Sequence, residues 1–109
     1  MSAMVKSSID INRLTNGKVL NLAGHDRGLA ARDSFELARL DKSEQAIIVH
    51  FPDGFRQLSS SFFQGMFADS VRQLGSVKAF FEHYRFDAPA HIRTKLADYA
   101  EQILNRRDY

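Results

Sequence analysis

The chain has 109 residues, 44% hydrophobic and 26% charged, with two prolines and six glycines, a composition typical of one folded domain rather than a disordered or fibrous segment. Its 15 Lys and Arg residues nearly balance its 13 Asp and Glu residues, which gives nucleic-acid binding little support. It contains no cysteine, which excludes disulfides, thiolate zinc sites and cysteine nucleophiles.

The first third of the chain predicts a β-hairpin followed by a helix. Apolar and polar side chains alternate in Ser8–Asn12 and Val19–Ala23, the period of half-buried strands, and Asn16-Gly17 between them favours a hairpin turn. From about Gly28 to Leu40, apolar residues recur at three-to-four spacing, which predicts a helix, with Asp26 as its N-cap.

The middle of the chain predicts the central strand and a second helix. Ala46–Phe51 is a short apolar run rich in β-branched side chains, typical of a strand covered on both faces. Ser60–Leu74 carries a broad apolar stripe that predicts a helix ending at Gly75. Because serine is a preferred N-cap, we expect the serines Ser59 to Ser61 to cap this helix first of all.

The last third predicts a strand and a final helix. The aromatic composition of Val77–Phe86 favours a strand, although a helix is also compatible with it. Asp87 is the expected N-cap of the last helix, Pro89 lies near its first turn, and apolar residues from Ile92 to Leu104 line one side. The whole order predicts an α/β fold, a small sandwich with a mixed sheet of about four strands and about three helices packed on it.

The segment "ARDSFELARL" followed by "AIIVHFPDGFRQLSSSFFQGMF" resembles an uncharacterised bacterial STAS-like family, related in fold to the anti-sigma factor antagonists. The match covers roughly residues 28–74, and the rest of the chain agrees with the family in its order of elements. Arg32 stands where the family has its helix-opening arginine, and Ser60, Ser61 and Phe62 match the serine-phenylalanine start of the next helix. The resemblance makes Arg32 and His50 candidate partner-binding residues as well. The resemblance therefore implies a STAS-like sandwich.

The resemblance also implies a regulatory protein-interaction module rather than an enzyme. In regulatory STAS domains a serine or threonine at this helix start is phosphorylated by a partner kinase, and the surrounding surface docks that partner. The implied partner is a regulatory protein such as a histidine-kinase-like ATPase, docked through residues 51–67, with Ser60 as the first phosphoacceptor candidate and Ser59 or Ser61 next. His50 stands where the family has an aspartate, and Gln64 and Gly65 where it has an acidic pair, which implies a different partner or docking without phosphorylation.

Phe62 and Phe63 are the expected docking anchors at this surface. Adjacent helix positions lie about 100° apart, so a single narrow stripe cannot bury both side chains equally. We therefore expect one of them at the edge of the packed face, where an exposed aromatic ring would suit an interface hot spot.

Two other functions compete with this interpretation. The aromatic and basic stretch 77–86 suits a small nucleic-acid-binding protein that uses Lys78, Tyr84 and Arg85. A weaker alternative is an enzyme with Ser60 as nucleophile and His50 as its base, but the glycine-flanked serine elbow of hydrolases is missing. His50 is otherwise expected to be a hydrogen-bonded, partly buried residue of its strand.

The sequence contains no motif for a cofactor, a metal ion or export. The four histidines lack a recognisable metal-ligand spacing, and the glycines ahead of the first predicted helix match neither the dinucleotide-binding pattern nor the P-loop. The start of the chain has no signal-peptide core, and no run of about 18 apolar residues occurs. We therefore expect a single cytoplasmic domain over residues 1–109 without metal or cofactor.

Overall fold

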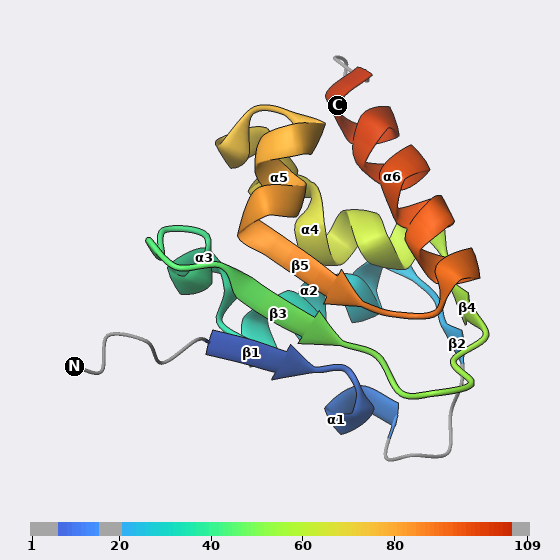
Figure 1. Ribbon diagram of the computed structural model, residues 1–109. Helices are drawn as coiled ribbons and strands as arrows, with labels where there is room; N and C mark the ends of the chain where they lie inside the picture. Colours follow the sequence, from blue (N-terminus) through green and yellow to red (C-terminus); the bar gives the residue numbers. More distant parts are fainter. Residues whose placement is uncertain (1–6, 16–20, 106–109) are drawn as a thin grey trace.

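The computed structural model describes residues 7–15 and 21–105 (Figure 1). In chain order the elements are β1 (Ser7–Asp10), α1 (Asn12–Thr15), β2 (Asn21–Leu22), α2 (His25–Ser34), α3 (Leu37–Leu40), β3 (Ile47–His50), β4 (Gln57–Leu58), α4 (Ser60–Leu74), α5 (Val77–His83), β5 (Tyr84–Asp87) and α6 (Ala90–Asn105). Within these residues no helix is both long and apolar enough to cross a membrane.

Two small parallel sheets organise the strands. The larger has the order β1-β3-β5, and its register aligns Ile9, Val49 and Phe86 in one row. The smaller pairs β2 with β4. The predicted α/β class is therefore confirmed, with β3 as the predicted central strand, but the predicted mixed sheet is wrong because every strand pair in the described residues is parallel. The described residues also form two sheets, of three and two strands, and six helices, where one sheet of about four strands and about three helices were predicted.

The predicted N-terminal hairpin is also wrong, because β1 and β2 belong to different sheets. The apolar strand β3 needs a neighbour on each side, and β1 and β5 supply them, so β1 pairs with a strand far along the chain instead of with β2. The Asn16-Gly17 dipeptide, expected at the hairpin turn, lies outside the described residues.

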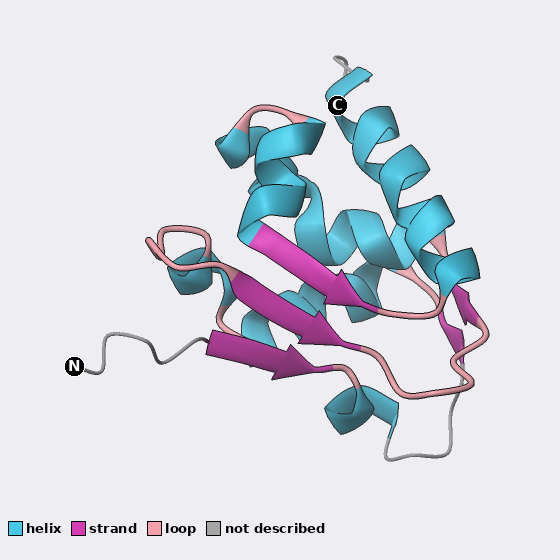
Figure 2. Ribbon diagram, viewed as in Figure 1, coloured by secondary structure: helices cyan, strands magenta, loops and turns pink. Residues whose placement is uncertain are grey.

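The described helices pack on one face of the larger sheet. Both crossovers, β1 to β3 and β3 to β5, advance in the same direction, and right-handed crossovers that advance the same way place their helices on the same side. In the view of Figure 2, α2 and α4 lie behind the strands and no described helix crosses in front of them. Ile9 and Val49 are accordingly buried, whereas the next row, Asp10, His50 and Asp87, lies on the open face and is exposed or half-buried.

The predicted helix from Gly28 to Leu40 is broken into two. It begins at His25, three residues earlier than predicted, and Gly24 rather than Asp26 takes the N-cap position, with a φ of 98° that favours glycine. It ends at Ser34, and Glu36 has a left-handed φ of 57° before α3 starts. The left-handed residue turns the chain so that Phe35 and Leu37 both enter the core.

The predicted strand Val77–Phe86 is mostly helix. Ser76 is the N-cap of α5, with its Oγ accepting the Ala79 N–H at 3.0 Å, and only Tyr84–Asp87 is a strand. The helix cap at Ser76 favours a helix here more than the β preference of the aromatic side chains favours a strand. Asp87 therefore ends β5 instead of capping α6, which begins at Ala90.

Candidate functional site

The serine run at the start of α4 contains the helix cap. Ser59 has the extended backbone of an N-cap (φ −74°, ψ 156°), and its Oγ accepts the Phe62 N–H at 3.1 Å. The Ser59 and Ser61 hydroxyls also hydrogen-bond each other at 3.1 Å. The predicted cap is thus confirmed at Ser59, and the half-buried Ser60 and Ser61 occupy the first helical turn.

Phe62 and Phe63 are both buried, so the prediction that one of them lies at an exposed edge is wrong. The residues are 1% and 0% exposed. Helix α4 packs against α2 on one side and against α6 on another, so two faces are covered instead of one narrow stripe. The Phe63 ring lies 5.3 to 6.0 Å from the rings of Phe67, Phe80 and Tyr99, which makes it a core residue and removes it as a docking anchor.

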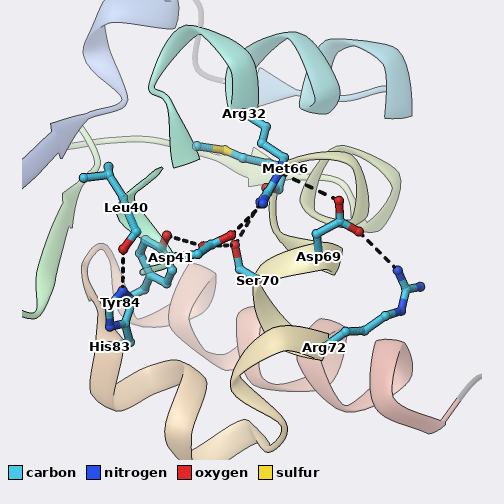
Figure 3. Close-up of polar contacts among 9 residues, drawn as sticks. All are labelled: Arg32, Leu40, Asp41, Met66, Asp69, Ser70, Arg72, His83 and Tyr84. Carbon is cyan, nitrogen blue, oxygen red and sulfur yellow. Dashed lines mark hydrogen bonds and ion pairs between the residues drawn. The ribbon is translucent and has the colours of Figure 1, made fainter. Parts of the chain in front are cut away.

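Arg32, a predicted partner-binding residue, belongs to a buried polar network (Figure 3). Its guanidinium donates to the Met66 carbonyl at 3.0 Å, to Ser70 Oγ at 2.9 Å, and to Asp41 Oδ2 at 2.6 Å. Ser70 and Tyr84 each donate a hydroxyl to Asp41 Oδ1 at 2.5 Å. The Arg32 side chain is only 12% exposed, so little of it is available to a partner.

This network ties α2, α3, α4 and β5 together at a buried carboxylate. The Asp41 side chain is 0% exposed, and such a carboxylate is tolerated only when its oxygens are paired and hydrogen-bonded. Burial raises the pKa of the Tyr84 hydroxyl, and the hydrogen bond to Asp41 raises it further, because ionised Tyr84 would face a second negative charge. The network therefore fixes the helices relative to the sheet rather than forming an accessible site.

His50 lies at the carboxyl end of β3 and takes no part in the hydrogen bonds of the serine run. Its Nδ1 donates to Asp87 Oδ2 at 2.9 Å, and both side chains are well exposed. All the serines of the run are described, and none of them forms a hydrogen bond with His50. The predicted pairing of Ser60 with His50 as nucleophile and base is therefore not formed.

The stretch 77–86 does not form the predicted stacking platform for nucleic acid. Tyr84 is fully buried and bound to Asp41, and Lys78 forms an i,i+4 ion pair with Glu82 at 3.1 Å. Arg85 alone of the three proposed residues is exposed without an ion-pair partner among the described residues.

The surface beside the serine run has a different apolar centre, Leu29. It is the one large hydrophobic residue exposed in the described parts of the chain, at 46%. It lines a pocket of about 250 Å³ between α2 and α4, together with His25, Gln64, Gly65, Ala68, Asp69 and Arg72. Ser61, Gln64 and Ala68 follow one another at three and four residues on α4, so the pocket wall continues to the serine run.

Two glycines that the sequence interpretation missed bring α2 and α4 together at this surface. A Cβ at Gly28 would lie 2.2 Å from the Phe62 carbonyl oxygen, and a Cβ at Gly65 would lie 2.2 Å from the His25 carbonyl oxygen. Only glycine permits backbones to approach this closely. The signal was Gly65 inside a strongly apolar helix, where an uncompensated glycine would be unfavourable.

Comparisons with known proteins do not assign this arrangement to a family. No protein-family model matches the chain, and neither a curated protein nor a solved structure matches it significantly. The resemblance to STAS-like proteins, which depends on short motifs, thus stays a prediction.

Proposed function

We propose that this chain is a cytoplasmic, STAS-like, non-enzymatic module that binds a regulatory protein through the Leu29 surface, defined as His25, Leu29, Ser61, Gln64 and Ala68. The observation that carries the proposal is the exposure of Leu29 over the pocket between α2 and α4. Full burial of a leucine stabilises a complex by roughly 1.5–3 kcal/mol, so its exposed half offers a partner about half of that. The Leu29 surface takes the place of the predicted Phe62 and Phe63 anchors.

The serine run gives this surface a means of regulation. Ser59 is committed to the cap, and a phosphate on its Oγ would compete with the bond from the Phe62 N–H. Ser60 makes no side-chain hydrogen bond among the described residues, so its hydroxyl is the better phosphoacceptor candidate. A phosphate there would add roughly −1.5 to −2 charges beside the Leu29 surface while gaining from the N-terminal dipole of α4.

The resemblance to STAS-like proteins favours a histidine-kinase-like ATPase as the partner. A partner of that kind would place an apolar residue over Leu29 and its polar rim against Gln64 and His25. A phosphate near Ser60 would then oppose docking by its charge and bulk, which is how a phosphorylated helix start can act as a switch.

The test compares Leu29→Glu with Ala38→Glu, a matched change at an exposed position of α3. The partner is first captured by the wild-type chain, identified as an ATPase by mass spectrometry, and purified for calorimetric titration. We expect Leu29→Glu to weaken binding at least about tenfold, because it places a charge at the centre of the interface, and Ala38→Glu to bind like the wild type. Equal affinities for Leu29→Glu and the wild type would refute the proposal that the Leu29 surface binds the partner. A captured protein that no longer binds after purification would also count against the proposal.

A further inference from the structure

The structure has a groove along the outer edge of β5, remote from the serine run in sequence. It has a volume of about 390 Å³ and a mostly apolar lining from α5, β5 and α6, made by Phe81, Tyr84, Arg85, Phe86, Arg93, Leu96 and Ala97. In Figure 1, β5 lies at one edge of the three-stranded sheet and α6 rises away from it beyond the strand's end. The groove is therefore bounded by a sheet edge on one side and by a helix on the other.

The outward-facing backbone groups of Phe86, in β5, are unpaired along this groove within the described residues, whereas the Tyr84 N–H is bonded to the Phe80 carbonyl. The Phe51 N–H donates to the Asp87 carbonyl, so with the parallel register the N–H and C=O groups of Asp87 and Arg85 face β3. Those of Phe86 face the opposite way, where the described residues provide no further strand and no backbone partner. An unpaired strand edge beside a groove is the feature that domains binding extended peptides use to add a strand.

The two walls of the groove differ in chemistry. Phe86 faces the helical side, and Leu96 with Ala97 supplies an apolar wall on α6. Arg85 and Arg93 are exposed, and neither has an ion-pair partner among the described residues. The Arg85 Nε donates only to the Glu82 carbonyl oxygen, at 3.4 Å, among the described residues. Two guanidinium groups without ion pairs beside an apolar floor complement a segment that carries both carboxylates and apolar side chains.

We propose that this groove binds an extended acidic-apolar peptide segment of a partner protein, which pairs with the free edge of β5 as an additional strand. An extended chain alternates its side chains between two sides, so apolar residues would enter between Phe86 and Leu96 while alternate acidic residues meet Arg85 and Arg93. Main-chain hydrogen bonds to Phe86 would supply affinity, and the arginines would select acidic sequences. The groove is separate from the Leu29 surface, so this binding does not depend on the function proposed above.

Two other occupants of the groove compete with the peptide. Single-stranded nucleic acid would also meet the arginines, but stacking requires open ring faces and Tyr84 is buried while Phe81 and Phe86 are half-buried. A second copy of the chain could pair β5 with β5 about Phe86, which would set Arg85 of one copy opposite the exposed Asp87 of the other, and sedimentation separates this occupant from a peptide. The two arginines, which form no ion pair among the described residues, favour an acidic peptide.

The test uses a fluorescein-labelled eight-residue peptide of alternating glutamate and valine, titrated into the full chain and followed by fluorescence anisotropy. Three probes accompany it: alternating lysine and valine, the glutamate peptide with proline at one central valine, and oligo-deoxythymidine. We expect saturable binding of the glutamate peptide only. The lysine peptide would bring its positive charges to two arginines, and the proline peptide lacks a backbone N–H that the added strand needs. Amide hydrogen exchange of Phe86 should slow when the peptide is bound.

The protein variants locate the binding. The double variant Arg85→Glu with Arg93→Glu should weaken binding of the glutamate peptide at least about tenfold. The control Arg27→Glu with Lys42→Glu makes the same charge change at exposed positions elsewhere and should leave the affinity unchanged. Equal effects of the two pairs, or equal binding of the proline peptide, would overturn the proposal. So would salt-sensitive binding of oligo-deoxythymidine alone, or a dimer in sedimentation that Ala97→Glu dissolves.

Discussion

Gly65→Ala tests the close crossing of α2 and α4, on which the Leu29 surface and the buried network both depend. A Cβ at this position would lie 2.2 Å from the His25 carbonyl oxygen and 2.9 Å from the Leu29 backbone nitrogen. An ordinary contact begins near 3.4 Å, so the two helices would have to separate by about 1.2 Å. Both neighbouring atoms belong to backbone, so no side-chain rotation can relieve the overlap.

The expected loss of stability follows from two opposing terms. Overpacking costs about 1–3 kcal/mol, and a backbone-to-backbone overlap belongs at the upper end of that range. Alanine gains about 1 kcal/mol over glycine in the interior of a helix. The free energy of unfolding should therefore fall by about 2 kcal/mol, which for a domain of this size lowers the melting temperature by roughly 10 °C.

The assay is urea denaturation followed by circular dichroism at 222 nm, with Gly75→Ala as the matched control. Gly75 has a φ of 90° and open space around its Cβ position, so alanine there should cost only about 1 kcal/mol of backbone strain. Gly28→Ala and Gly65→Ala should also be less than additive when combined, because the first separation of the helices makes room for the second Cβ. A Gly65→Ala protein as stable as the wild type would refute the close crossing.

Two further predictions concern the buried network and the helix cap. Tyr84→Phe removes a hydrogen bond to the buried Asp41 and should cost about 1–3 kcal/mol. Because folding raises the pKa of Tyr84, the unfolded chain releases its proton first, near pH 10, so the wild type should lose stability above about pH 10. The difference between wild type and Tyr84→Phe in urea titrations should shrink over that range, and parallel pH curves would contradict this. Ser59→Ala should cost about 1 kcal/mol through loss of the cap, whereas Ser60→Ala should change stability by less than about 0.5 kcal/mol, and equal costs in thermal unfolding would contradict the assignment of the cap.

The elements that local pattern predicted well are those whose pattern is long or bounded by a specific cap. Helix α4 was predicted over its observed range because a broad apolar stripe ends at Gly75, which has the left-handed φ of a C-cap. Helix α5 was missed because its seven residues carry few helical turns of periodicity, and aromatic side chains suit either structure. The hairpin prediction was wrong because two short alternating segments do not indicate which strand each will pair with.

The site was harder to predict because its contacts span long stretches of chain. Asp41 lies in the polar break "DKSEQ", where an aspartate is typical of a loop. Its partners Ser70 and Tyr84 are 29 and 43 residues away, so local spacing carries no trace of the network. The resemblance made Arg32 a partner-binding candidate, whereas the crossing of α2 over α4 brings it to Ser70 in the buried network.

The direction of winding of the larger sheet bears on where the two proposed binding surfaces lie. With the order β1-β3-β5, both crossovers place their helices on one face, so no described helix covers the other face and no described strand pairs with either outer edge. Parallel sheets are usually covered on both faces, and here Arg85 and the half-buried Ile48 are aligned on the open face. Helix α4 packs between α2 and α6, so it separates the Leu29 surface from the groove beside β5. A phosphate at Ser60 would therefore act on a partner at the Leu29 surface and leave a peptide in the groove in place.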